Sequence, residues 1–178
     1  MMTNTPAITK EELLTKLATA VGGADLSDLN LSGLQLSNVN LRRAKLYRTN
    51  LTFTSLNNAD LTEAKLTDAV LVGADLEGAS LFGTNLEKAD LRQADLKDAN
   101  LIAASLREAN LEGANLEGAT LQSADLEKAN LVDVNLKHCN VDDACLKSAN
   151  LLRADLTNVD LACVELKGAT MPDGTVHD

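Results

Sequence analysis

The sequence predicts an all-β solenoid built from five-residue units, and two patterns predict it. A leucine recurs at every fifth position from Leu26 to Leu166, so that 28 of the 29 central positions are Leu and Val141 is the exception. The residue two places before each centre is Ala in 19 of the 29 units. Neither a helix, with a period of 3.6, nor a strand, with a period of two, places these residues on one side.

Each unit is explained as a short extended side followed by a corner. If the central residue is i, positions i−2 and i point inward, position i−1 points outward, and the chain bends across i+1 and i+2. Position i−1 is Asp or Asn in 19 of the 29 units, which suits an outward side chain that bonds nearby backbone. All seven glycines of the repeat occupy i+2, where an unusual φ or a close backbone approach is needed. They are Gly33, Gly73, Gly78, Gly83, Gly113, Gly118 and Gly168.

Leucine and alanine must fill the interior, because aromatic residues make up only 2% of the chain and Trp is absent. Burial of each leucine is worth about 1.5–3 kcal/mol, so the central leucines are the expected source of stability. The length of 178 residues indicates a single domain. The predicted structural core includes Leu26, Leu46, Leu66, Leu86, Leu91, Leu96, Leu101, Leu106, Leu126 and Leu166.

Charge and cysteine content limit the possible partners and compartment. A net charge of −10 disfavours direct binding to nucleic acid or to an anionic membrane. We expect no signal peptide, because Met1–Lys10 has no apolar run, and no stretch approaches the ~18 apolar residues of a membrane span. The three cysteines have no spacing typical of a disulfide framework. These features predict a cytoplasmic protein with reduced thiols.

The head of the chain, residues 1–23, predicts one short helix. Thr9 and Glu12 have the spacing of a capping box, and Ile8 can pack onto Leu13. Its apolar side consists of Leu13, Leu14, Leu17, Ala18 and Val21, and Gly22-Gly23 ends it. So short a helix needs an apolar surface to lie on, and solenoids need terminal caps, so we predict that it covers the open end. Binding of a partner by this helix is the alternative.

The repeat spans residues 24–171, with Met171 at a thirtieth centre, and a short tail follows at 172–178. Pro172-Asp173-Gly174 predicts a turn in the tail, and Pro there blunts an exposed edge. Residues larger than Ala occupy i−2 near both ends of the repeat, where one neighbour is not another tight coil. They are Leu29, Leu34, Val39, Val159 and Val164.

The tandem units A(D/N)LxX, as in 89–93 and 109–113, resemble the pentapeptide-repeat family in its uninterrupted, cyanobacterial form. The match covers 29 units of five residues, which is 145 of the 178. The resemblance implies a right-handed quadrilateral β-helix with four units per coil and about seven coils. At ~4.8 Å between neighbouring strands, the rod would be roughly 35 Å long.

The family resemblance implies a non-enzymatic interaction or scaffold module for an unidentified protein partner, as a monomer or weak dimer. The alternative is an acidic DNA mimic that binds a type II topoisomerase (gyrase), as some family members do. Four units per coil give the rod four faces, and the net charges of these faces, in chain order from the unit of Leu26, are 0, −1, −4 and −3. A DNA duplex of ~35 Å carries ~20 phosphates, so strong mimicry is not expected. The most acidic column contains Asp75, Glu77, Asp95, Asp98 and Glu117, with Lys97 among them. An ice-binding solenoid is disfavoured, because the outward Thr52, Thr62, Thr67 and Thr157 do not align.

Outward apolar residues are the candidate interaction surface, because contiguous apolar patches mark binding sites. Two pairs are 20 residues apart and would stack, and a third cluster lies near the head. The residues are Phe82 with Ile102, Val132 with Leu152, and Phe53 with Val70 and Val72. Incidental surface exposure is the other interpretation. A basic spot of Arg42, Arg43, Lys45 and Arg48 is attributed to local charge balance.

No catalytic, cofactor or metal site is predicted. His138, Cys139, Asp142, Asp143 and Cys145 are close in sequence, but Cys139 at i−2 should point inward while His138 and Cys145 point elsewhere. Zinc needs convergent ligands, so these residues do not indicate a zinc site. No Ser/His/Asp or Cys/His arrangement or phosphate loop occurs, and a packed interior should leave no pocket. We therefore do not expect an enzyme.

Overall fold

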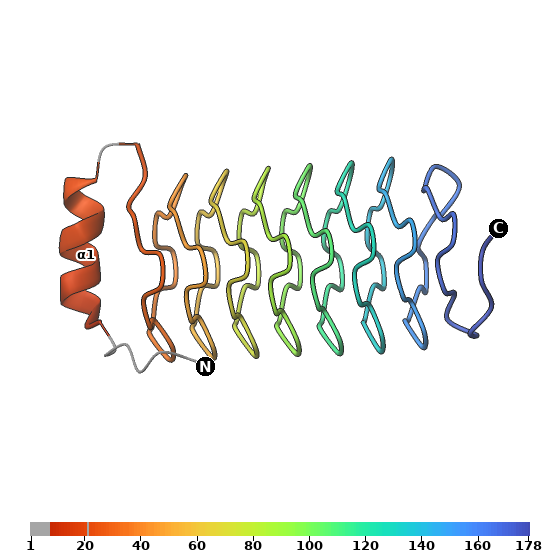
Figure 1. The fold of residues 1–178 in the computed structure, drawn as a ribbon, viewed down its shortest axis with the longest axis horizontal. Coiled ribbons are helices and arrows are strands. Elements are labelled where there is room, and N and C mark those ends of the chain that lie inside the picture. The colour runs from red at the N-terminus through yellow and green to blue at the C-terminus, as the bar shows by residue number, and fades with distance from the viewer. Residues whose placement is uncertain (1–7, 21) are drawn as a thin grey trace.

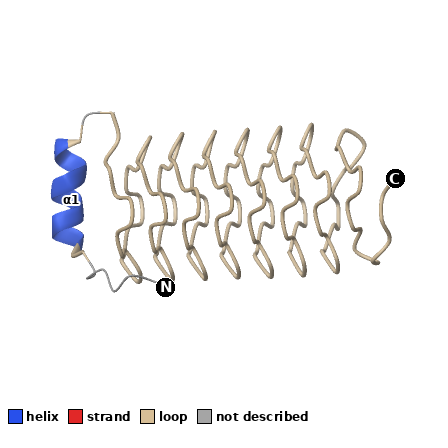
Figure 2. Cartoon of the chain, in the orientation of Figure 1, coloured by secondary structure: helices blue, strands red, loops and turns tan. Residues whose placement is uncertain are grey.

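The computed structural model describes residues 8–20 and 22–178 and shows a straight stack of coils with one helix across its N-terminal end (Figure 1). Helix α1, Lys10–Thr19, is the helix of the described residues. The coils pair through isolated parallel bridges between residues 20 apart, such as Asn100 with Thr120, so the described part is drawn without strands (Figure 2). We name the four faces A, B, C and D in chain order. They begin with the units of Leu26, Leu31, Leu36 and Leu41, and each recurs every 20 residues.

Backbone hydrogen bonds join each unit to the coils on both sides and close its corner. In the unit of Leu101, the N–H groups of Leu101 and Ala103 donate to Thr120 and Gln122 of the next coil, at 2.8 and 3.0 Å. Asn100 donates to Ala79 of the preceding coil, at 2.9 Å, and Ala104 donates to Leu101, at 3.0 Å, which closes the corner. Almost every backbone N–H and C=O group therefore has a hydrogen-bond partner in its own coil or in an adjacent one. For this reason a side with only one bridged residue is enough to hold neighbouring coils together.

The core is a ladder of inward leucines, and all ten predicted core leucines are buried. The alanines at i−2 are buried beside them. Where Thr replaces Ala at this position, the hydroxyls of Thr49, Thr54 and Thr84 donate to the carbonyls of Leu26, Leu31 and Leu61, each at 2.9 Å. Each of these buried hydroxyls therefore has a backbone carbonyl of the preceding coil as its hydrogen-bond acceptor.

The corners all use the left-handed region of φ, not only where glycine occurs. In 28 of the 29 units the residue at i+2 has a positive φ, and 21 of these residues are not glycine. Ala103, with φ of 55°, is one of them. A residue of this φ at the third position of a turn closed by the bond from i+3 to i is the geometry of a type II turn. β-Branched residues and Pro, which tolerate this φ least, are absent from the 29 corner positions.

Where position i−1 is Asp or Asn, its side chain hydrogen-bonds to the backbone of the corner from the outside. In all 19 units that have Asp or Asn there, the side-chain Oδ1 accepts from the backbone N–H at i+1, as Asn100 does from Ile102 at 3.1 Å. The remaining 18 bonds have distances from 2.9 to 3.4 Å. This confirms that the outward Asp and Asn residues bond nearby backbone.

Acid should therefore loosen the corners, and Asp155 gives the clearest case. The hydroxyl and N–H of Thr157 and the Nζ of Lys137, at 3.1 Å, hold the pKa of Asp155 at about 2, below its ordinary 3.8. Because the folded pKa is lowered, this carboxylate stabilises the fold above pH ~4 and loses that contribution as the pH falls toward 2. Thermal melts between pH 7 and 2 should show a smaller acid-induced decrease for Asp155→Asn than for wild type. An equal decrease in both proteins would contradict the assignment.

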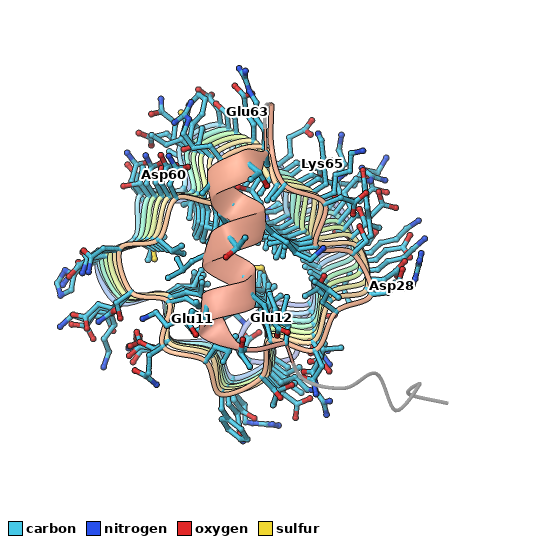
Figure 3. The ribbon with its side chains drawn as sticks, turned by 90° about the vertical axis from the view of Figure 1, so that its left-hand side faces the viewer. Glu11, Glu12, Asp28, Asp60, Glu63 and Lys65 are labelled. Carbon is cyan, nitrogen blue, oxygen red and sulfur yellow. The ribbon has the colours of Figure 1, made fainter. Side chains whose placement is uncertain are left out.

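Helix α1 is held by its predicted capping box. The N–H of Glu12 donates to Thr9 Oγ1 at 3.2 Å, and the N–H of Thr9 donates to Glu12 Oε2 at 2.8 Å. Leu13 is fully buried and Leu17 half-buried against the first coil, whereas Leu14 and Ala18 are exposed. Residues 1–7 and Val21, which was assigned to the apolar side, lie outside the described residues. The helix lies across the end of the stack (Figure 3).

The last coil departs from the regular ladder on face D. Asp160 forms no bridge to Asn140, although Asn140 is bridged to Thr120, and Cys163 is the one corner residue of the repeat without a positive φ. Leu161 on face D and Leu156 in the preceding unit, on face C, are only half-buried. The tail covers part of this end. After the Pro172 turn, it returns antiparallel, with Thr170 bridged to Val176 and the N–H of His177 donating to Ala169 at 2.9 Å.

Candidate interaction surface

The seven candidate residues lie on two opposite faces. Five of them lie on face B and form two clusters, Phe53 with Val70 and Val72, and Val132 with Leu152. Phe82 and Ile102 lie on face D, on the other side of the stack. The structure therefore brings together five of the seven predicted residues along one face and separates the remaining pair from them.

Phe53 dominates the first cluster on face B. Its side chain is 69% exposed, and its N–H donates to Val72 at 3.0 Å, so the two residues belong to adjacent coils. The ring lies over the backbone of Gly73 so closely that a β-carbon there would collide with it. Val70 and Val72 are half-buried next to it. The cluster is thus an aromatic ring in close contact with a glycine of the next coil, together with two valines.

The second cluster lies three coils further along the same face. The N–H of Asp133 donates to the carbonyl of Leu152 at 3.0 Å, which stacks the Val132 and Leu152 units. Both side chains are half-buried. A β-carbon at Gly174 would lie 3.7 Å from Leu152 Cδ1, so the tail borders this cluster.

A hollow of about 340 Å³ lies between the two clusters. Its lining residues are Val72, Arg92, Gln93, Glu112, Gly113 and Asp133. Two of its charges are already paired: Arg92 chelates Asp90 at 2.8 and 2.7 Å, and Arg153 chelates Asp133 at 2.6 and 2.6 Å. These guanidinium bonds lower the pKa of Asp90 and of Asp133. Glu112 is exposed and makes no ion pair within 4 Å among the described residues.

Face D carries a smaller patch. Phe82 is 43% exposed and Ile102 is half-buried, and the N–H of Gly83 donates to Ile102 at 2.9 Å. Thr62, the neighbour of Phe82 in the preceding coil, was expected to point outward, but it is only 7% exposed. Its hydroxyl lies 3.0 Å from that of Ser80, so neighbouring side chains cover it.

The basic spot near the head is paired internally. Arg43 and Arg48 contact Glu63 and Asp28, each at 2.7 Å. Arg42 contacts Asp60 at 3.3 Å, and Lys45 contacts Asp25 at 3.9 Å. These contacts join residues 18 to 20 apart in sequence, in adjacent coils, which confirms local charge balance as the explanation of this spot.

The residues considered for a metal site occupy different positions of the repeat. Cys139 is buried, its Sγ donates to the carbonyl of Leu116, and burial raises its pKa to about 12. His138 occupies a corner, and Cys145 is half-buried at i−1. In the described part of the chain, no three His, Cys, Asp or Glu side chains are placed to hold a metal ion.

The expectation that the packed interior leaves no pocket did not consider the N-terminal end of the stack. A cleft of about 600 Å³ lies between α1 and the first coil, with Leu14, Leu17, Val39, Leu41 and Arg43 among its lining residues. It arises because a cylindrical helix cannot match the flat end of a square coil. Leu14, which was assigned to the apolar side of the helix, lines this cleft and is 45% exposed.

Stacked five-residue units, corner turns and a leucine ladder define a β-solenoid of the pentapeptide class. The sequence profile of pentapeptide repeats matches eight copies, over residues 24–62, 59–98, 99–137 and 129–171. The chain therefore belongs to the pentapeptide repeat family, whose fold is the right-handed quadrilateral β-helix. The family consists of structural and interaction modules rather than catalysts.

Solved structures of the family are similar to the chain. HetL, involved in heterocyst differentiation regulation in the cyanobacterium Nostoc sp. strain PCC 7120, is 29% identical over 96% of this chain and 100% of its own, with a TM-score of 0.37. A pentapeptide repeat protein of the Arabidopsis thaliana thylakoid lumen is 30% identical over 66% of this chain and 68% of its own, with a TM-score of 0.29.

QnrB1, a plasmid-mediated fluoroquinolone resistance protein, is 22% identical over 85% of this chain and 76% of its own, with a TM-score of 0.48. No curated protein matches the chain. Among the described residues, no helix has the length and apolar character needed to traverse a bilayer.

Proposed function

We propose that the chain is a non-enzymatic interaction module of about seven coils that binds a protein partner along face B. The observation that carries this proposal is the pair of apolar clusters at the two ends of one face. Apolar groups that line up on a flat surface favour a partner with its own apolar side chains, because burying them is favourable for both proteins. We further propose a cytoplasmic location and binding by one copy of the chain.

The spacing along face B sets the size of the partner. Val72 and Val132 are separated by three coils, or about 14 Å at ~4.8 Å per coil. Phe53 and Leu152 are separated by five coils, or about 24 Å. A single helix of the partner, at 1.5 Å per residue, would need about 16 residues to span both clusters. A flat strip of this length suits an element of folded protein better than a small molecule.

Charge in the hollow favours a basic group in the partner. Glu112 lies between Val72 and Val132 and has no ion-pair partner within 4 Å in the described part of the chain, whereas the neighbouring Asp133 is neutralised by Arg153. The net charge of −10 also attracts a basic partner from a distance. The partner surface that fits is therefore apolar, with a Lys or Arg placed against Glu112.

Helix α1 has the position of an end cap in this proposal. Leu13 is buried, and the N–H of Ile8 donates to Asn30 at 3.2 Å, so this segment is tied to the first coil. Covering the first coil hides its unpaired edge, which would otherwise be a template for aggregation. Partner binding through the helix would instead require Leu13 to be exposed.

The alternative, an acidic mimic that binds gyrase, would use face C. Its carboxylates are partly engaged, since Asn115 Nδ2 donates to Asp95 at 3.0 Å and Asn135 Nδ2 donates to Glu117 at 3.2 Å. A gyrase supercoiling assay separates the two proposals. Inhibition by micromolar protein would support the mimic, and we expect none.

Two double variants test the face. Val132→Ser/Leu152→Ser removes one apolar cluster of face B, and Phe82→Ser/Ile102→Ser removes the patch of face D. Partner proteins captured by the wild-type chain are purified. Their affinities for the wild-type chain and for each of the two double variants are then measured by calorimetry. We expect the face B variant to weaken binding by about 10-fold or more, because each buried apolar side chain contributes on the order of 1–2 kcal/mol.

The face D variant is the matched control, because it removes apolar area of similar size from the opposite face. Thermal melts establish that both variants remain folded. A partner that binds all three proteins equally would overturn face B as the binding face. Loss of binding with the face D variant alone would place the partner there instead.

A further inference from the structure

One corner of the solenoid carries a column of alternating charges. The first six of the eight corner residues of face A are, in order along the rod, Asp28, Arg48, Asp68, Lys88, Glu108 and Lys128, and the uncharged Ser148 and Gly168 follow. All six are exposed, and all six have φ between 52° and 60°, so each side chain leaves the backbone in the same direction. The backbone bonds of this corner continue without a break from Asp28 to Lys128. Figure 3, which looks along the rod, shows Asp28 at the edge of this side.

Only the first two residues of the column, Asp28 and Arg48, form an ion pair with each other. Arg48 chelates Asp28 with two bonds of 2.7 Å. Lys88 and Lys128 contact Glu87 and Glu127 of their own units instead, at 3.6 and 3.7 Å. Among the described residues, Asp68 and Glu108 make no ion pair within 4 Å. The carboxylates of Asp68 and Glu108 are therefore free of direct ion pairs within the described part of the chain, although the charge of Asp68 acts on the nearby Arg48.

We propose that this corner of face A is a self-association surface that binds a second copy of the chain side by side and antiparallel. A column of six alternating charges has opposite signs at its two ends, so reversing it produces its complement. A twofold axis between Asp68 and Lys88 places Asp68 against Lys88 of the second copy and Arg48 against Glu108. It also places Asp28 against Lys128. The contact is isologous, as expected of a closed dimer.

The neighbouring columns are compatible with this arrangement. The same axis places Tyr47 against Arg107 of the second copy, which suits a cation–π contact. On the other side of the corner, the column of face B is Asn30, Asn50, Val70, Asp90, Asn110 and Asn130. The axis places Val70 against Asp90 of the second copy, whose carboxylate is chelated by Arg92, so no like charges meet there. The charges of face A sum to 0, so repulsion comes only from the more distant acidic faces. At ~0.1 M salt the Debye length of about 10 Å screens most of that repulsion.

Sedimentation velocity of the full chain tests the proposal. The contact is one corner wide, so we expect weak association, with a sedimentation coefficient that rises between about 10 μM and 1 mM protein at ~0.1 M salt. Because the contact is made of ion pairs, about 1 M salt should return the protein to the monomer. A protein that stays monomeric at ~0.1 M salt, or a dimer that persists at ~1 M salt, overturns the proposal.

Two charge-exchange variants distinguish ion pairs between two copies of the chain from ion pairs between neighbouring coils of one copy. Asp68→Lys/Lys88→Asp and Arg48→Asp/Asp68→Lys both keep the net charge, and each creates two like-charge neighbours within the column. Across the twofold axis, however, the first variant keeps all six contacts complementary. The second turns four of the six into like-charge contacts.

We expect the first variant to associate like wild type and the second to associate at least about tenfold more weakly, because like charges placed opposite one another oppose binding. Melting temperatures of both variants verify that they are folded. Equal loss of association in both variants would show that the alternation acts only within one stack and would overturn the proposal. Wild-type association in both would overturn it as well, because the contact would then lie elsewhere.

Discussion

Replacing Leu101 with Asp should unfold the solenoid at room temperature. Leu101 is fully buried in the middle of the ladder, between the units of Leu81 and Leu121 on face D. An ionised carboxylate has no partner there, since the interior is mainly leucine and alanine and its buried Thr hydroxyls already donate to backbone carbonyls. The cost of burying it exceeds what a marginally stable domain can tolerate. Circular dichroism should show loss of the β-type spectrum and of the cooperative melt.

Three further variants are compared with Leu101→Asp: a cavity at the same position, a less buried leucine, and the same charge on the outside. Leu101→Ala, which only creates a cavity, should lower the free energy of unfolding by about 2–5 kcal/mol. Leu161→Ala should cost less, because Leu161 is half-buried in the irregular last coil. Ile102→Asp is the matched control: it places the same charge one residue away but on the outside, and it should leave the fold intact. A native melt for Leu101→Asp would mean that the central leucines are not interior.

Gly23→Ala should detach the N-terminal helix from the first coil. Gly23 has a φ of 113°, and a β-carbon there would lie 2.6 Å from the carbonyl carbon of Arg43 and closer still to its oxygen. The unfavourable φ alone costs about 1–3 kcal/mol, and the clash is with backbone that the ladder holds in place. We expect a lower melting temperature together with loss of the helical signal at 222 nm.

Gly22→Ala is the control for backbone conformation alone. Gly22 also has a positive φ, of 87°, but a β-carbon there meets nothing within 4 Å. Its melting temperature should therefore lie between those of wild type and Gly23→Ala. If the two alanine variants melted together, the close approach of Gly23 to Arg43 would not be what seats the helix.

The candidate surface was predicted residue by residue but not as a surface. The period of five identified Phe53, Val72, Val132 and Leu152 as outward, because alternation along one unit decides in or out. Their common face follows from the 20-residue pairing of the coils, which the family resemblance implied and the bridges between coils show. The hollow at Glu112 depends on Arg92 turning toward Asp90 and Arg153 toward Asp133, and such side-chain pairings have no signature in the sequence.

Local pattern by itself determined the interior leucines, the corner positions, the fastening of corners by Asp and Asn, and the capping box of α1, because each depends on residues within one unit or one turn. Only the tertiary structure decided the rest. The buried Thr62, the cleft beneath α1 and the broken ladder at Asp160 all arise where one coil meets another coil or an end. The positive φ at 21 corner residues other than glycine is a local feature, but their residue types did not indicate it. The physical reason is that a five-residue unit cannot bury its own apolar side chains, so contacts between stacked units decide every feature beyond the unit.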